Sequence, residues 1–405
     1  MQGGTVGVTV TETDTGWAAR IAGMAIIAAV GVSIIYVPQP IQTLAAAELG
    51  VPLAESSSAT VAVQAGYAIG VVFLVSLGDR LIPRQQVSIQ LAITALAILV
   101  AAVASNFAVF TAMMFVAGAT ATIGQILVAA ALRLAPPEKR ARTAAVLVGS
   151  LLIGLFGMRT LLGTFAEALG WRTVLVGTAV LALACIPLAL RFAPRSRPPG
   201  VSSYLGILAS IPRIVGKSRS LRLLTVTHAL AFSAFISVWS MVTLYGVTQL
   251  GLSVTQTAAI GLAGLAGGAT TAASARGQAL LGTRRALPIS LAALIVGAAA
   301  VALGSAVLAV VVVGLFLVSF GMSSSQVSSQ ANALASVAPA ESGRANTVFM
   351  ATTFFASALA TAIADTIMHT VGYAGVGVFS LVLGVGSLTV ALIADREPAT
   401  IASPR

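Results

Sequence analysis

The feature that most constrains this chain is a succession of long apolar runs, each close to the length that crosses a lipid bilayer. A helix needs about 20 apolar residues to span the hydrocarbon core, where every backbone polar group must be paired within the segment. Twelve runs meet this requirement: 21–46, 59–78, 86–104, 108–132, 144–166, 172–192, 222–246, 255–274, 287–303, 306–334, 344–368 and 373–394. The sequence therefore predicts an all-α integral membrane protein with twelve transmembrane helices. The least distinct boundary lies between the ninth and tenth spans, where only Gly304 and Ser305 offer a turn.

Composition supports the same class of protein. The 405 residues are 58% hydrophobic and 8% charged, with a mean hydropathy of +1.01. Soluble domains average about 45–50% apolar and about 25% charged residues. The 39 glycines suit membrane helices, which use small residues to approach one another closely.

The distribution of positive charge predicts the orientation. A net charge of +11 would suggest a nucleic-acid partner in a soluble protein. Here, of 22 Lys and Arg residues, only Arg159 and Arg172 lie away from the loops and helix ends of one membrane side. Basic residues concentrate on the cytoplasmic side of membrane proteins. We therefore expect cytoplasmic termini, an uncleaved first span and no nucleic-acid partner.

The chain divides into two similar halves. The polar stretch 193–221 separates the sixth and seventh spans, and a constant shift places Arg20 on Arg222, Pro137 on Pro339 and Gly170 on Gly372. Such self-similarity predicts an internal duplication. We expect a cytoplasmic N-terminal tail (1–19) followed by a six-helix bundle (20–192). A cytoplasmic linker (193–221) then leads to a second six-helix bundle (222–394) and a cytoplasmic C-terminal tail (395–405).

Several motifs carry a resemblance to a known family. "GDRLIPR" at 78–84 resembles a loop signature of the major facilitator superfamily, and "GSLLIGLFGMRTLLG" at 149–163 resembles the Gly-rich fifth span of its antiporters. "YVPQPIQ" and "SSQVSSQANALASVAPAESGRANTVFM" look like a bacterial branch of twelve-span efflux permeases. The resemblance covers roughly residues 20–394.

The resemblance implies the fold and the mode of action. It implies two pseudo-symmetric six-helix bundles that alternate access to a central site, in a multi-pass protein of the bacterial cytoplasmic (inner) membrane. It favours export of a small amphipathic or drug-like compound, with proton antiport as the energy source. The expected partners are a small-molecule substrate, the lipid bilayer and protons, and we expect a monomer without a cofactor. The alternatives are an exporter or facilitator of a sugar, nucleoside or amino acid, and a membrane receptor that does not transport.

Two departures from the family pattern are visible. The second-half loop "ARGQALLGTRR" has Ala279 and Leu280 where an Asp-Arg pair would stand, so the two loops are not expected to gate symmetrically. The fifth span has Gly157 and Met158 in place of the Gly-Pro pair of drug/proton antiporters.

An enzyme or metal protein is not expected. None of the eleven acidic residues falls at the middle of a span, and the only histidines, His228 and His369, lie in different halves. This spacing does not favour a metal site or a catalytic triad. The single cysteine, Cys185, has no partner for an intrachain disulfide.

The sharpest candidate residue is Arg159. It follows Arg142 by 17 positions, which as helix is about 25 Å and places it in the outer half of the fifth span. An arginine inside a membrane is costly and normally faces a polar cavity or a specific partner. We expect a role in substrate binding or gating; the alternative is snorkelling or a structural pairing with Glu167.

Other polar side chains within the spans are candidates for the substrate cavity, with interhelical hydrogen bonding as the alternative for each. We also expect Pro38 and Pro40 to bend the outer half of the first span. The predicted cavity residues are Arg159, Tyr36, Gln39, Gln64, Tyr67, Gln125, Trp239, Gln326 and Gln330.

A cytoplasmic gate is implied by the resemblance. In the family, the loop after the second span lies against the cytoplasmic start of the eleventh, here "ESGRANT" at 341–347. Asp79 would then interact with that helix start and with Arg142 or Arg344, supported by Arg80 and Arg84. The alternative is that these charges only determine topology.

Three residues are candidates for proton coupling: His228, Asp79 and Asp365. His228 in the inner third of the seventh span could titrate near neutral pH, or serve only as a hydrogen-bond donor. Asp365 and His369 share a helix face near the outer end of the eleventh span, as an extracellular gate pair or as a solvated pair.

Overall fold

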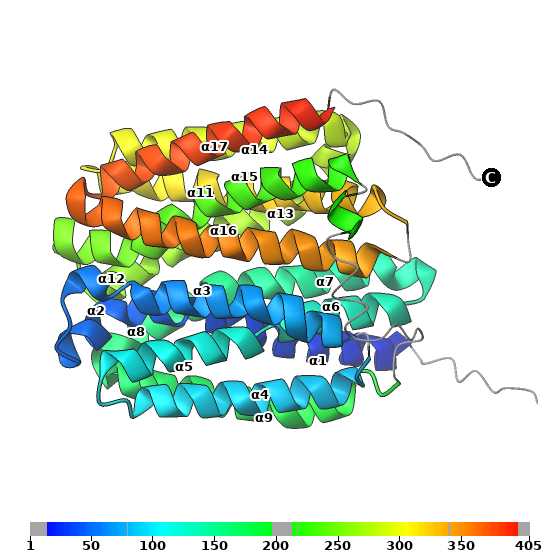
Figure 1. Cartoon of the computed structure of the whole chain (residues 1–405), viewed down its shortest axis with the longest axis horizontal. Coiled ribbons are helices and arrows are strands. Elements are labelled where there is room, and N and C mark those ends of the chain that lie inside the picture. Colours follow the sequence, from blue (N-terminus) through cyan, green and yellow to red (C-terminus); the bar gives the residue numbers. More distant parts are fainter. Residues whose placement is uncertain (1–13, 79, 197–212, 217, 339–340, 396–405) are drawn as a thin grey trace, which may run out of the picture.

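The computed structural model describes residues 14–78, 80–196, 213–216, 218–338 and 341–395. All regular elements within these ranges are helical, and most helices run side by side along one direction (Figure 1). The N-terminal set comprises α1 (Asp14–Ser33), α2 (Pro38–Glu48), α3 (Ser58–Gly70), α4 (Pro83–Ala102), α5 (Phe107–Thr120), α6 (Ile123–Leu134), α7 (Arg140–Leu152), α8 (Met158–Leu169) and α9 (Trp171–Phe192). The C-terminal set comprises α11 (Arg219–Gln249), α12 (Val254–Ala259), α13 (Gly261–Leu281), α14 (Thr283–Leu303), α15 (Leu308–Ala335), α16 (Ser342–Thr370) and α17 (Tyr373–Asp395).

Among the described residues, eleven helical segments are long and apolar enough to cross a membrane. The predicted eighth span corresponds to α12 and α13, which adjoin at Ile260, so the count is compatible with the twelve predicted spans. The boundary between the ninth and tenth spans is confirmed, because α14 ends at Leu303 and α15 begins at Leu308. The all-α membrane fold is therefore confirmed.

The two helix sets lie on opposite sides of the molecule in Figure 1, with α1–α9 in the lower half and α11–α17 in the upper half. The sets contact each other where α3 meets α16 and where α8 meets α12. We call the end that carries the short connections 49–52, 170 and 250–253 the outer end, and the opposite end the inner end. The outer end lies at the left of Figure 1. Much of the predicted linker 193–221 lies outside the described residues.

The first span is broken, as its prolines predict. The helix α1 ends at Ser33, a tight 3-10 turn covers Ile34–Tyr36, and α2 begins at Pro38. Proline suits the first turn of a helix because its missing N–H would have no partner there. The break redirects the outer part of the span, which carries Gln39.

The fifth span contains a π-helical segment, Ile153–Gly157, between α7 and α8. A π-helical turn holds an extra residue, so it changes which side chains face a neighbouring helix, and such turns are frequent at functional sites. A Cβ at Gly154 would lie 2.1 Å from the Ala29 carbonyl oxygen on α1, so only glycine allows this close approach. This local geometry immediately precedes Arg159.

A Gly-rich seam joins the fifth span to α12 and α13. Added Cβ atoms at Gly163 and Gly264 would lie 2.5 Å from the Ala258 side chain and 2.2 Å from the Phe156 ring. Small residues of this kind let membrane helices pack closely. The seam holds α8 against the C-terminal set in the outer half of the molecule.

Candidate substrate site between the two helix sets

Arg159 on α8 lies buried at the contact between the two helix sets. Its Nη1 donates hydrogen bonds to Gln39 Oε1 on α2 and, at 2.8 Å, to the backbone carbonyl of Trp239 on α11. Its Nη2 lies 3.4 Å from Thr243 Oγ1, and the guanidinium carbon is 5.1 Å from the centre of the Trp239 ring. Arg159 therefore connects the outer parts of spans one, five and seven.

No carboxylate of the described part of the chain forms an ion pair with Arg159. The Glu167 carboxylate instead accepts a hydrogen bond from the Thr255 backbone N–H at 3.0 Å. The pairing of Arg159 with Glu167 is therefore wrong. The ionisable side chains near the guanidinium are the neutral phenols of Tyr373 and Tyr36.

Buried polar contacts extend from Arg159 across the same interface. Gln42 Nε2 donates to the Ser240 carbonyl at 3.4 Å, while Gln42 Oε1 accepts from Thr60 Oγ1 at 3.0 Å. Thr361 Oγ1 on α16 donates to Gln64 Oε1 on α3 at 3.2 Å. The Gln42–Ser240 and Thr361–Gln64 bonds join the two sets in the outer half, so the outer side of the interface is closed in this structure.

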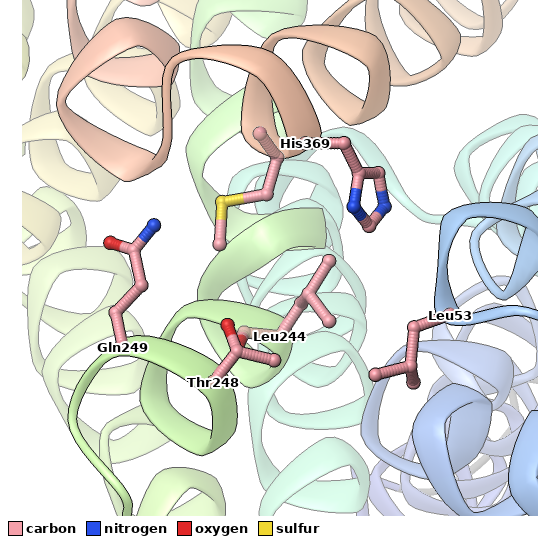
Figure 2. Close-up of a pocket in the computed structure, with 6 residues that line it drawn as sticks. Leu53, Leu244, Thr248, Gln249 and His369 are labelled. Atoms are coloured by element: carbon pink, nitrogen blue, oxygen red, sulfur yellow. The ribbon is translucent and has the colours of Figure 1, made fainter.

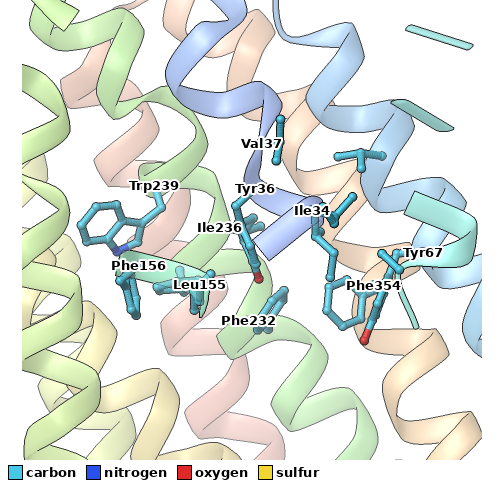
Figure 3. Packing of buried hydrophobic residues seen from close by; sticks show 14 of the residues in the cluster. Ile34, Tyr36, Val37, Tyr67, Leu155, Phe156, Phe232, Ile236, Trp239 and Phe354 are labelled. Carbon is cyan, nitrogen blue, oxygen red and sulfur yellow. The ribbon is translucent and has the colours of Figure 1, made fainter. Parts of the chain in front are cut away.

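Aromatic side chains pack close to these polar contacts, and Figure 3 shows several of the rings. The Trp239 ring packs edge-on against Phe156 at 5.4 Å, and its Nε1 donates to Ser319 Oγ at 3.0 Å. Tyr67 lies 4.3 Å from Phe354, between ring centres, and close to the Gln125 side chain. The interface thus offers apolar rings beside a small number of polar groups.

The structure brings together most, but not all, of the predicted cavity residues. Arg159, Gln39 and Trp239 are in direct contact, and Tyr36 lies near them. Gln64, Tyr67 and Gln125 belong to neighbouring parts of the same interface. In contrast, Gln330 Nε2 donates to Asn346 Oδ1 at 2.7 Å near the inner ends of α15 and α16. Gln326 is half-buried on that same helix, and no described contact links either glutamine to Arg159.

Sequence reasoning missed several polar residues of the site. Helical spacing was a usable signal for some, because Gln42 and Thr43 follow Gln39 by three and four positions and Thr243 follows Trp239 by four. Thr60 carries the same signal, because it precedes Gln64 by four positions, whereas Thr361 has no predicted cavity residue at that spacing.

The predicted cytoplasmic gate is described only in part. Asp79 lies outside the described residues, so its predicted contact with the start of α16 lies outside them as well. Arg80 and Arg142 are exposed, Arg344 is half-buried, and the Arg84 backbone N–H donates to the Pro194 carbonyl at 3.1 Å.

His228 is fully buried on α11 and stacks on Phe349 of α16, with ring centres 4.9 Å apart. Neither ring nitrogen has a hydrogen-bond partner. The structure therefore does not give His228 the hydrogen-bond role that was the alternative to proton coupling.

Asp365 and His369 form the predicted i, i+4 pair near the outer end of α16, with Nε2 and Oδ1 3.4 Å apart. The Asp365 side chain, 14% exposed, also lies beside Ser57 at the start of α3, which belongs to the other helix set. It therefore lies where the two helix sets meet. His369 borders a pocket of about 160 Å³ at the outer surface, whose lining Figure 2 shows: Leu53, Leu244, Thr248, Gln249, Met368 and His369.

The outer surface also holds an ion pair that ties three spans of the N-terminal set. Arg172 Nε donates to Glu48 Oε1 at 2.8 Å, and its Nη1 donates to the carbonyls of Ala102 and Ala104 at 2.7 and 3.0 Å. The hydrogen bond from Arg172 holds the pKa of the Glu48 carboxyl below its ordinary value. No cluster of three or more His, Cys, Asp or Glu suited to a metal occurs among the described residues.

Membrane-crossing helices in two sets, with a buried polar junction where the sets meet, define a multi-pass membrane transport protein. The family profile of the Major Facilitator Superfamily matches residues 21–361, and the chain belongs to this superfamily. Its function is therefore transport rather than catalysis, with a small-molecule substrate and the membrane as its partners.

Relatives and solved structures agree with this assignment. The chain is 32% identical over 359 residues to the probable transporter SCO4007 of Streptomyces coelicolor, covering 87% of this chain and 82% of that one. It is 30% identical over 223 residues to the uncharacterized transporter YgaY of Escherichia coli O157:H7, covering 55% of this chain. That match spans only 56% of the length of YgaY.

The fold is similar to those of solved transporters of low sequence identity. The human organic anion transporter MFSD10 (TETRAN) superposes with a TM-score of 0.70 at 15% identity, over 93% of this chain and 99% of that chain. A point mutant of the nucleoside transporter NupG superposes with a TM-score of 0.70 at 12% identity, over 93% of this chain and 98% of that chain. The POT family transporter PepTSo superposes with a TM-score of 0.72 at 11% identity, over 94% of this chain and 99% of that chain.

Proposed function

We propose that this protein is a secondary active transporter that exports a small amphipathic compound by alternating access, with the Arg159 junction at its centre. The observation that carries the proposal is the buried guanidinium of Arg159, which hydrogen-bonds α2 on one side and α11 on the other. The bonds to Trp239 and Thr243 on α11 exist only while the outer parts of the two sets touch. Separating the sets would break them and present the same polar groups to a solute.

The chemistry of the junction suits an amphipathic solute. Ligand sites are mostly apolar and aromatic, with a few placed polar groups that give orientation. Trp239, Phe156 and Tyr36 supply rings, whereas Arg159 and Gln39 supply polar contacts.

Proton antiport is the proposed mode of energy coupling, and Asp365 is the first candidate for the group that takes up and releases the proton. Its carboxylate lies between His369 and Ser57, so its protonation state would alter a contact between the helix sets at the outer end. His228 and Asp79 remain further candidates, the former because it is buried without a hydrogen-bond partner.

The proposal includes a gate at the inner end. Asp79, Arg80, Arg84, Arg142 and Arg344 would hold the inner ends of the two sets together when the outer ends separate. The bacterial relatives fit a cytoplasmic membrane, in which both termini would face the cytoplasm and the protein would act as a monomer.

Transport by purified protein in liposomes tests the proposal. A panel of labelled amphipathic compounds is measured with and without an imposed pH gradient, for the wild type, Arg159→Ala and the control Arg172→Ala. We expect gradient-driven efflux by the wild type and the control, and its loss in Arg159→Ala. Wild-type protein that moves none of the compounds, or full transport by Arg159→Ala, would contradict the proposal.

A further inference from the structure

We propose that the solute bound at the Arg159 junction carries an anionic oxygen group, such as a carboxylate, on an apolar aromatic body. The inference rests on the proposed function and specifies the class of its substrate. It is argued from the charge of the junction, from its unused hydrogen-bond donors and from its aromatic surface.

The first step is the unbalanced charge. Arg159 is 4% exposed, and its polar protein partners are an amide oxygen, a backbone carbonyl and a hydroxyl, all of them neutral. A buried charge is normally paired, because the interior does not replace its hydration. The junction therefore has a positive charge for which the described part of the chain supplies no counter-ion.

The second step is the set of unused donors. A guanidinium has five N–H donors. The described contacts of Arg159 use both N–H groups of Nη1 and one of Nη2. The Nε–H and the second Nη2–H are left, and these two nitrogens share one edge of the planar group. A carboxylate is the acceptor that binds two adjacent N–H groups of arginine at once.

Two more donors lie on α2, one of them on Gln39, whose Oε1 accepts from Arg159 Nη1. Gln39 Nε2 and Thr43 Oγ1 are both buried without a hydrogen-bond partner. The two residues are four positions apart, so they share a helix face about 6 Å apart along the axis. Unpaired buried donors are costly, and a ligand rich in acceptor oxygens would satisfy them.

The third step is the apolar side of the junction. Trp239 and Phe156 pack edge to face at 5.4 Å, and Figure 3 shows Tyr36 and Ile236 among the buried side chains around them. An aromatic body would pack against these rings when its acidic group meets Arg159. The Trp239 carbonyl and Thr243 hydroxyl then become exchangeable partners, which bind Arg159 only when no solute is present.

The test compares aromatic carboxylates with their primary amides, which have nearly the same shape but no charge. Binding of each matched pair is measured by calorimetry on purified protein, for the wild type, Arg159→Gln and the control Arg172→Gln. We expect the wild type and the control to bind the best acid about 10- to 100-fold more tightly than its amide. Arg159→Gln should bind both equally, and Thr43→Val should weaken acid binding more than amide binding.

The outcomes separate this inference from the proposed function. Transport of amides and acids at similar rates by the wild type would keep the transporter and overturn the anion preference. An acid preference that persists in Arg159→Gln would overturn the assignment to Arg159. Failure to transport or bind any member of the panel would count against both proposals.

Discussion

Arg159 and Trp239 make two contacts at once, since the guanidinium donates to the Trp239 backbone carbonyl at 2.8 Å and lies 5.1 Å from the centre of its ring. The two residues belong to different helix sets, so any separation of the outer ends must break both contacts. An arginine held this way can serve as a closing contact in one state and as a ligand group in another.

Arg159→Ala should abolish substrate binding and leave the protein monodisperse. Its thermal stability should change little, because the lost hydrogen bonds are offset by removal of a buried charge without a counter-ion. Arg159→Lys should recover little binding, since an ammonium group lacks the planar fork of a guanidinium. Ligand binding and thermal unfolding of the two variants check this. Normal binding by Arg159→Ala would refute a cavity role.

Asp79→Asn should keep expression and fold, shift the population toward the inward-open state and cut transport severely. A carboxylate near a helix N-terminus gains about 0.3–1 kcal/mol, and the amide loses this interaction. Cysteine accessibility at the inner mouth and the transport rate check the effect. Arg285→Ala, in the second-half loop without an Asp-Arg pair, should do much less. If Asp79→Asn shows wild-type cysteine accessibility and a wild-type transport rate, the charges of this loop serve only to determine topology.

Asp365→Asn should lose efflux driven by a pH gradient but retain exchange of labelled for unlabelled solute. Exchange needs the substrate site and the movement of the helix sets, whereas coupling also needs a group that takes up and releases a proton. Both rates are measured in the same liposomes. His369→Gln serves as the matched variant on the same face of α16. Gradient-driven efflux at the wild-type rate in Asp365→Asn would assign coupling to another residue.

Gly154→Ala should impair folding, because the new Cβ would lie 2.1 Å from the Ala29 carbonyl oxygen on α1. The control is Gly149→Ala, where nothing lies within 4 Å of the added Cβ and a helical alanine is favoured over glycine. Yield of monodisperse protein and thermal unfolding measure the difference. Equal behaviour of the two variants would mean that spans one and five are not packed this closely.

The Glu48–Arg172 pair should make a small, pH-dependent contribution to stability. The pKa of Glu48 is lowered in the folded state, so its contribution is present above the unfolded pKa of about 4.3 and is lost as pH falls through the folded value. The pair is exposed, so Glu48→Gln should cost less than about 1 kcal/mol. Arg172→Ala should cost more, because the carbonyls of Ala102 and Ala104 also lose their donor. Thermal unfolding at pH 7 and pH 4 checks which substitution costs more stability and whether the pair stabilises less at the lower pH.

The sequence was sufficient for the membrane fold, because apolar length and the position of charges act locally. It predicted the break at Pro38 and the i, i+4 pair of Asp365 and His369 for the same reason. It also placed Arg159 in the outer half of the fifth span, where the structure has it.

The partners of Arg159 were beyond sequence reasoning. Glu167 was the nearest acid along the chain, but its carboxylate binds the Thr255 N–H of the other helix set. Gln39 and Thr243 meet Arg159 only because the broken first span, the π-helical segment of the fifth and the Gly-rich seam fix how three helices approach. Gln330 is as polar as Gln39 in the sequence, yet it lies at the inner end against Asn346.

The most direct test of alternating access around Arg159 is a reversible cross-link between the outer ends of α8 and α12. Thr255 Oγ1 lies 3.4 Å from the Thr164 carbonyl there, and Arg159 bridges the sets deeper along the same helix. Thr164→Cys and Thr255→Cys are combined in a Cys185→Ala background, cross-linked, and assayed for transport in liposomes. We predict that transport stops when the cross-link forms and returns when it is reduced, with each single-cysteine variant unaffected. Full transport by the cross-linked protein would contradict the account, because the outer ends would then not need to separate.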